Sequence, residues 1–290
     1  MVKFTYFGHS CFLLEGAKGK IIIDKGRYEN FIFSDLKTDL TVDKKIWRLE
    51  NFFARSSGGA VRGGLAYVDS VAPRLSVTPE IDGVPFAALL RWLDIDQTEV
   101  VGKAYLKGNF ELDGTTGAAR KRSVDGAFQL RIEDGMAKRF RLLVRVLSFL
   151  DLTRWFSLKL PNLTQEGIHF RSVTADVKVL QGVYATENLL VDSDELRLSG
   201  AGTMEGPKGE LNFVIAVRPF PGLETAVNYI PLIGRGLAAI KNSLLVASFN
   251  VRGPLDDPTI TPAPLSTLSE FFFGALSIPQ SLIPKSDEKK

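Results

Sequence analysis

Apolar and polar residues alternate along much of the chain, which is the pattern of β-strands that have one dry face and one wet face. The alternation is clearest in Leu106–Asp113, Phe128–Glu133 and Val173–Val179, and Leu211–Val217 is a more uniformly apolar segment of the same kind. Shorter segments lie near Phe31–Val42, Leu65–Tyr67, Leu75–Val77, Leu189–Asp192, Leu196–Ser199 and Ala247–Arg252. The pattern predicts a strand at each of these places.

Glycines lie between and beside these segments, and glycine readily adopts the positive φ that tight hairpin turns require. We expect turns at Gly58-Gly59, Gly63-Gly64, Gly114, Gly126, Gly135, Gly200, Gly202, Gly206 and Gly209. Short strands that alternate with such turns at roughly even spacing are typical of an antiparallel sheet, a sandwich or an open barrel.

Four segments are predicted to be helical. Phe86–Leu93 is short, and Leu223–Lys241 is interrupted by Pro231, which breaks helices. Met136–Phe156 repeats apolar residues at helical spacing and has a basic side, and Leu265–Leu276 is a last apolar segment. The fold class that follows is mainly β (β-rich α+β). We expect an elongated, curved antiparallel sheet, or an open groove or half-barrel, with a few amphipathic helices.

The composition of the 290 residues is ordinary for a globular protein, with 45% hydrophobic and 24% charged residues. A net charge of +3 is too balanced for a protein that binds nucleic acid through bulk charge, so no nucleic-acid partner is expected. One cysteine excludes an intrachain disulfide. No signal peptide is evident at Met1–Phe7, and no apolar run reaches about 18 residues. We therefore expect any targeting segment or membrane anchor to be absent from this chain.

Three motifs follow one another in the last third of the chain: Leu196–Gly202 (LRLSGAG), Tyr229–Gly234 (YIPLIG) and Phe249–Pro258 (FNVRGPLDDP). In this order, and with Val124–Gly135 upstream, the chain from about residue 27 to residue 290 resembles the AsmA-like family. The motif residues are those of strand ends, turns and helix breaks, so structural roles are expected for them rather than chemistry. These signature residues are Gly200, Gly202, Pro231, Gly234, Gly253, Pro254, Asp257 and Pro258.

The resemblance implies a non-enzymatic envelope protein of Gram-negative bacteria that holds or conducts phospholipid between the inner and outer membranes. It also implies a periplasmic β-groove, an inner-membrane anchor in full-length relatives, and a role in outer-membrane lipid homeostasis. One apolar strand face suits this function, because acyl chains avoid water on it. The predicted lining of such a groove is Leu106, Phe110, Leu112, Phe128, Leu130, Ile132, Val173, Val177 and Val179.

Three alternatives stay open at this point. The first is that, at any single position, the apolar side chain of a strand belongs to a packed core and does not contact lipid. The second is that the protein is a structural or assembly factor. It would bind outer-membrane proteins by pairing strands at its edge, with an outer-membrane or periplasmic protein as partner. The segments 136–156 and 265–276 either contact a membrane surface or close the ends of the groove.

The first 24 residues differ from the rest. Met1–Asp24 resembles the opening hairpin of a metallo-β-lactamase-fold hydrolase, but the His-x-His-x-Asp-His cluster of that family does not follow. The chain has two histidines, so a zinc site built from His9, Cys11, Asp24 and His169 is disfavoured, and a degenerate hydrolase is the least favoured function. We expect no catalytic residues, no metal and no cofactor. The expected domains are a hairpin head at 1–24, the groove domain at 25–284 and a charged tail at 285–290.

Overall fold

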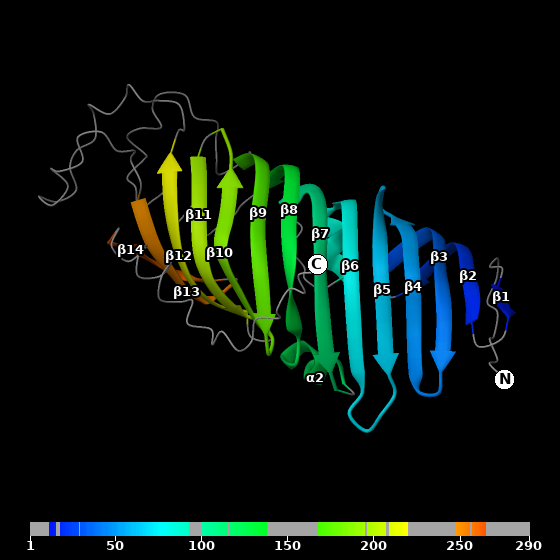
Figure 1. The fold of residues 1–290 in the computed structure, drawn as a ribbon. Helices are drawn as coiled ribbons and strands as arrows, with labels where there is room; N and C mark the ends of the chain where they lie inside the picture. Colours follow the sequence, from blue (N-terminus) through cyan, green and yellow to red (C-terminus); the bar gives the residue numbers. More distant parts are fainter. Residues whose placement is uncertain are drawn as a thin grey trace, which may run out of the picture.

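The computed structural model describes residues 12–15, 18–28, 30–92, 100–114, 116–137, 168–194, 196–206, 209–219, 247–255 and 257–264. They form one antiparallel sheet of 14 strands, in which every strand pairs with the strand that precedes it in the sequence (Figure 1). The strands are β1 (Phe12–Glu15), β2 (Lys18–Tyr28), β3 (Phe31–Asp43), β4 (Ile46–Ser56), β5 (Gly59–Val68), β6 (Arg74–Pro85), β7 (Val100–Asp113), β8 (Asp125–Ala137), β9 (Ile168–Leu180), β10 (Val183–Asp192), β11 (Leu196–Glu205), β12 (Glu210–Pro219), β13 (Ala247–Pro254) and β14 (Thr259–Ala263). The helices are α1 (Phe86–Trp92) and α2 (Gly117–Arg122).

The predicted fold class is confirmed, because the chain is mainly β and its elongated sheet stays open. Each strand predicted from the alternation lies within an observed strand. The helix predicted at Phe86–Leu93 is observed as α1, which ends at Trp92. Residues 223–241 and 265–276 lie outside the described residues. The helix predicted from Met136 is wrong at its start, because Met136 and Ala137 extend β8 and pair with β9.

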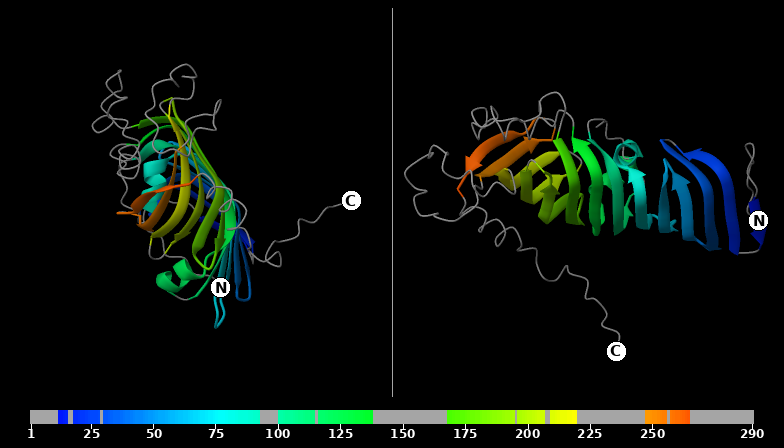
Figure 2. Two further views of the ribbon diagram at one scale, coloured as in Figure 1. Left: turned by 90° about the vertical axis from the view of Figure 1, so that its left-hand side faces the viewer. Right: turned by 90° about the horizontal axis from the view of Figure 1, so that it is seen from above.

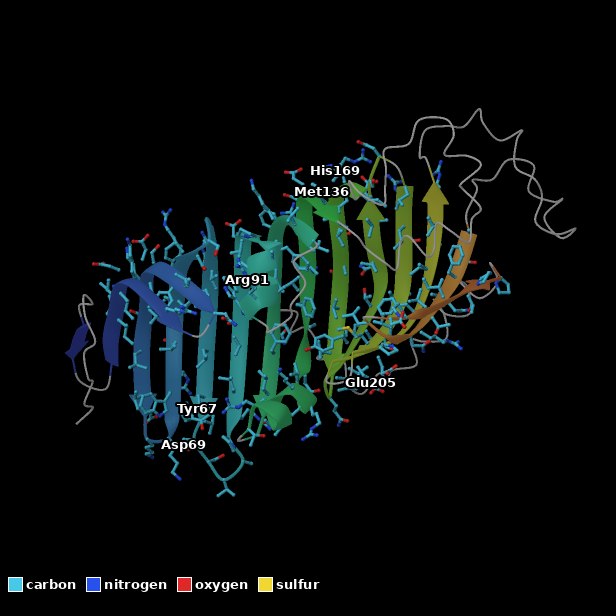
Figure 3. The ribbon with its side chains drawn as sticks, turned by 180° about the vertical axis from the view of Figure 1, so that it is seen from behind. Tyr67, Asp69, Arg91, Met136, His169 and Glu205 are labelled. Atoms are coloured by element: carbon cyan, nitrogen blue, oxygen red, sulfur yellow. The ribbon has the colours of Figure 1, made fainter. Side chains whose placement is uncertain are left out.

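Successive strands alternate in direction, so their connections gather at two edges of the sheet. The upper edge, in the view of Figure 1, carries α1 after β6, and the lower edge carries α2 after β7. Figure 3 shows Met136 and His169 at the upper edge and Tyr67, Asp69 and Glu205 at the lower edge. The views in Figure 2 show that α1, β13 and β14 lie on the same side of the sheet.

The first strands of the sheet cross the boundary that the sequence predicts at residue 24. Strand β1 pairs with β2, and β2 pairs with β3 from Lys18 to Tyr28 without an interruption at Asp24. The segment predicted as a separate head therefore continues into the same sheet wherever it is described. The domain boundary itself stays a prediction.

Several glycines that we expected in turns lie inside strands instead. Gly202 is in the middle of β11, where a Cβ atom would lie 2.4 Å from the carbonyl oxygen of Asn212 and 2.6 Å from the Cα atom of Phe213. Only glycine lets the neighbouring backbone approach so closely. The turn prediction is wrong for Gly63, Gly64, Gly126, Gly135, Gly200 and Gly202. It is correct for Gly58, at the tip of the β4–β5 hairpin with a φ of +89°.

Two clusters of buried side chains stabilise the sheet. Near the C-terminal end, Leu196, Val217 and Val251 are almost completely buried and belong to a cluster with residues from β9, β11, β12, β13 and β14. Near the middle of the upper edge, Ala88 and Leu89 of α1 bury part of β6 and β7. Between these clusters, β8 and β9 have individual buried side chains such as Ile132 and Val179, but no further cluster is found among the described residues.

Candidate functional site: the apolar face of the sheet

One face of the sheet carries rows of apolar side chains that cross many strands. Paired residues in neighbouring antiparallel strands point to the same side, so the register defines each row. The lowest of the long rows runs through Leu40, Leu49, Leu65, Val77, Phe110, Gly126, Val179, Tyr184, Met204 and Leu211. A second row runs through Val61, Ile81, Leu106, Leu130 and Ala175. A third runs through Val84, Ala104, Ile132, Val173, Val191, Leu198, Val217 and Ala247. We call the surface that these rows form the apolar face.

All nine residues predicted to line a groove lie on the apolar face. Leu106 is paired with Leu130, Phe128 with Val177, and Ile132 with Val173, and Phe110 and Val179 both pair with Gly126. Leu112 lies two residues beyond Phe110 in β7 and therefore points to the same side. The rings of Phe110 and Phe128 contact each other with centroids 5.6 Å apart. That these residues contact lipid remains a prediction.

The opposite face is charged. Across it run ion pairs between neighbouring strands, with separations of 3.3 Å for Arg62 and Asp82, 3.0 Å for Arg74 and Asp113, and 2.9 Å for Arg197 and Asp192. Exposed pairs of this kind add little to stability. They do show which face meets water, because side chains that need hydration gather on it.

The middle of the apolar face is only half covered. Leu65, Val77, Phe110, Phe128 and Leu130 are all neither fully buried nor fully exposed. In most domains a second layer of helices or strands covers such a face. Here, of the two helices that the structure describes, α1 packs on this face and only near the upper edge (Figure 3). A continuous, partly exposed apolar surface of this kind is typical of a binding surface.

Two hollows of about 620 and 570 Å³ lie over β6–β11. The first includes Leu106 and Leu130 in its lining, and the second includes Phe128 and Val177. Most of the residues that line each hollow, Lys107 among them, belong to the charged opposite face, so the hollows do not support a site on the apolar face.

The signature residues in the described ranges have structural surroundings. Gly200 and Gly202 lie on the apolar side of β11, each paired with β12. Gly253 and Pro254 end β13, as expected, and the next turn is fixed by a hydrogen bond from the Leu255 amide to the Gly209 carbonyl at 2.9 Å. Asp257 and Pro258 lie in this same turn, where Pro258 is buried, whereas Pro231 and Gly234 lie outside the described residues.

The structure separates the residues of the disfavoured zinc site. Asp24 lies on β2 and His169 on β9, seven strands away, which corresponds to about 34 Å at a strand spacing of about 4.8 Å. His9 and Cys11 lie outside the described residues. Across the described ranges, no three His, Cys, Asp or Glu residues come together as a metal site would require.

Four titratable groups of the described residues have shifted pKa values, and burial or ion pairing explains each. Hydrogen bonds to aspartates raise the pKa of the Arg74 and Arg171 guanidinium groups. The Arg171 and Arg197 guanidinium groups hold the pKa of the Asp192 carboxyl below its usual value. Burial raises the pKa of the Tyr184 hydroxyl. Tyr184 and Asp192 lie near opposite ends of β10, so they do not form one acid–base pair.

Comparison with known proteins decides the family. The family model described as "YhdP protein" matches residues 18–260, which is most of the chain. The chain belongs to the YhdP family. The AsmA-like resemblance seen in the sequence is thereby confirmed.

A curated relative of this YhdP-family chain is the "Intermembrane phospholipid transporter YhdP" of Escherichia coli (strain K12). The two are 27% identical over 129 residues, which cover 41% of this chain and 10% of the relative. The chain thus matches a small part of a much longer protein. No solved structure matches. Neither helix in the part of the chain that the structure describes is long and apolar enough to cross a membrane.

Proposed function

We propose that this chain is a segment of a lipid conduit, and that its apolar face holds the acyl chains of phospholipids as they pass between the inner and outer membranes. The half-exposed apolar rows between the two buried clusters carry this proposal. An acyl chain on these rows removes both its own surface and that of the side chains from water. The role is non-enzymatic, because holding a lipid on a surface requires no chemical step.

The dimensions of the sheet fit such a ligand. Strands β7–β10 have 10 to 14 residues, which gives a face about 33–46 Å across at about 3.3 Å per residue. Fourteen strands span about 60 Å along the long axis of the sheet. An acyl chain is about 15 Å long, half the hydrocarbon thickness of a bilayer. One lipid therefore occupies a few strands, and several lipids fit along the face.

The family supports the setting that we propose. The curated relative is named as an intermembrane phospholipid transporter, and the matched 41% of this chain covers a tenth of it. We therefore assign the chain to the periplasm of Gram-negative bacteria, within a longer protein anchored in the inner membrane, and to the lipid homeostasis of the outer membrane. Contacts of residues 136–156 and 265–276 with a membrane surface stay predictions.

Strand pairing with an outer-membrane protein is less well supported, because the edges of the described sheet are short. Strand β1 has four residues and β14 has five. Pro262 of β14 has no amide hydrogen to donate to an added strand. Short edge strands that contain proline are a common way to prevent such pairing.

The test is lipid retention by the purified chain, measured by native mass spectrometry and by lipid extraction from the same sample. We expect the purified chain to retain one or more phospholipid molecules per protein molecule. Val177→Asp places a charge on the apolar face and should remove the lipid, whereas Lys178→Asp changes the adjacent residue on the opposite face and should not. Retained polypeptide without lipid, or equal lipid loss in both variants, would contradict the proposal.

A further inference from the structure

Amphipathic aromatic residues line the lower edge of the apolar face. Trp47 and Tyr67 are directly paired across β4 and β5, and Tyr184 lies in the lowest long row of the face. Trp47 is 39% exposed and Tyr184 is half-buried, so each combines an apolar body with partial access to water. Tryptophan and tyrosine take such positions where lipid tails meet water.

A basic helix adjoins this lower edge. The last turn of α2 contains Arg120, Lys121 and Arg122. Arg120 donates a hydrogen bond to the Gly114 carbonyl at 3.1 Å, which fixes the helix to the end of β7. Lys121 and Arg122 are exposed, and in the described ranges neither has a carboxylate within ion-pair distance. Two cations therefore remain available to an external anion.

At the upper edge two arginines are paired, whereas Arg91 of α1 (Figure 3) has no ion pair among the described residues. Arg55 lies 3.3 Å from Asp35, and Arg171 contacts both Asp192 and Asp194. These ion pairs satisfy the guanidinium groups internally. Among the described residues, the lower edge therefore carries two adjacent unpaired cations at α2, and the upper edge carries Arg91 on α1.

Helix α2 and Tyr184 belong to one continuous surface. The Gly182 amide donates a hydrogen bond to the Val124 carbonyl at 2.9 Å, directly after α2. A Cβ atom on Gly182 would lie 2.7 Å from the Lys121 carbonyl, so the β9–β10 turn packs on the helix. Tyr184 follows Gly182 by two residues, at the beginning of β10. Figure 2 shows α2 on the side of the sheet that α1 occupies, which is the side of the apolar face.

We infer that Lys121 and Arg122 bind the phosphate of a glycerophospholipid headgroup, while its acyl chains lie on the apolar face and extend toward the upper edge. This inference rests on the proposed function and adds an orientation to it. Buried tails leave the headgroup at the rim, where its negative charge attracts nearby lysine and arginine. From Val179 to Val173 the strand rises about 20 Å, which accommodates an acyl chain of about 15 Å. The adjoining apolar rows favour a lipid over free phosphate as the source of the anion.

Two photoreactive phosphatidylglycerol probes test this orientation, one with the diazirine on the headgroup and one with it at the end of an acyl chain. Each is loaded onto the full chain, and labelled peptides are mapped by mass spectrometry. The headgroup probe should label α2 and the β9–β10 turn, and the tail probe should label the half-buried Leu130 and Val173. Lys121→Glu with Arg122→Glu should lower headgroup labelling at α2 by roughly tenfold.

The matched control reverses the same amount of charge on the opposite face, with Lys37→Glu and Lys178→Glu, and should leave the labelling unchanged. Tail labelling of the apolar face together with headgroup labelling spread evenly over both edges would overturn the orientation alone. No tail labelling of the apolar face would overturn the proposed function and the orientation with it. Saturable binding of inorganic phosphate at α2, measured by NMR shifts, without any headgroup labelling there would overturn the assignment to a lipid headgroup.

Discussion

Leu106 of β7 and Leu130 of β8 are paired directly across the sheet on its apolar face, and neither is fully buried. The pair continues to Ala175 of β9 on one side and to Ile81 of β6 on the other. Such a row would form the core of a two-layer domain if another layer covered it. Ile81 and Ala175 are buried, but Leu106 and Leu130 stay partly exposed, and in the proposed function a lipid tail covers them.

The apolar face and the buried cluster should respond differently to the same substitution. Leu198→Ala removes a buried side chain of the C-terminal cluster and should lower the free energy of unfolding by about 2–5 kcal/mol. Leu130→Ala removes a half-exposed side chain and should cost about 1 kcal/mol or less. Urea unfolding of both variants measures the difference. Equal losses would mean that Leu130 is as deeply packed as the cluster.

Gly202 should not tolerate a side chain. Gly202→Ala places a methyl group 2.4 Å from the Asn212 carbonyl oxygen, and the backbone shift that relieves this contact should cost about 1–3 kcal/mol. Gly117→Ala is the control, because a Cβ atom there would contact nothing within 4 Å. Thermal unfolding should show a lower midpoint for the first variant and an unchanged or slightly higher one for the second. A tolerated Gly202→Ala would contradict the close approach of β11 and β12.

The ion pairs of Asp192 should make part of the stability depend on pH. Arg171, and then Arg197, lowers the pKa of this carboxyl in the folded state. A lowered pKa stabilises the fold above the pKa of the unfolded carboxyl, about 3.9, and this contribution disappears as the pH falls through the folded value. Asp192→Asn should therefore be less stable than the unmodified chain at pH 7, and the gap should narrow at pH 3. The same gap at both pH values, in parallel urea titrations, would assign the loss to packing.

The shared face of the predicted lining residues could be read from the sequence because a strand has a fixed period. Leu106, Phe110 and Leu130 alternate with charged or polar neighbours, and alternation alone places them on one side. Strand β4 escaped prediction because its alternation breaks. Leu49 and Ala54 both lie on the apolar face although they are an odd number of positions apart, because the chain has a bulge at which Asn51 adopts a φ of +52°.

Contacts between strands could not be predicted in the same way. The place of Gly202 inside β11 depends on how closely β12 approaches, and a single strand does not contain that information. Helix α2 has six residues and no repeated apolar spacing, so the pattern missed it and, with it, the cations at the lower edge. The extent of the apolar face follows from the register of fourteen strands rather than from any one of them.

If lipid tails lie on the apolar face of this sheet, site-specific photo-crosslinking in living cells should detect them there. A photoreactive amino acid replaces Leu130 in one variant and the adjacent Gln129, on the opposite face, in another. We predict that phospholipid crosslinks to position 130 and not to position 129. Equal crosslinking at both positions, or none at position 130 while the protein remains folded, would contradict it.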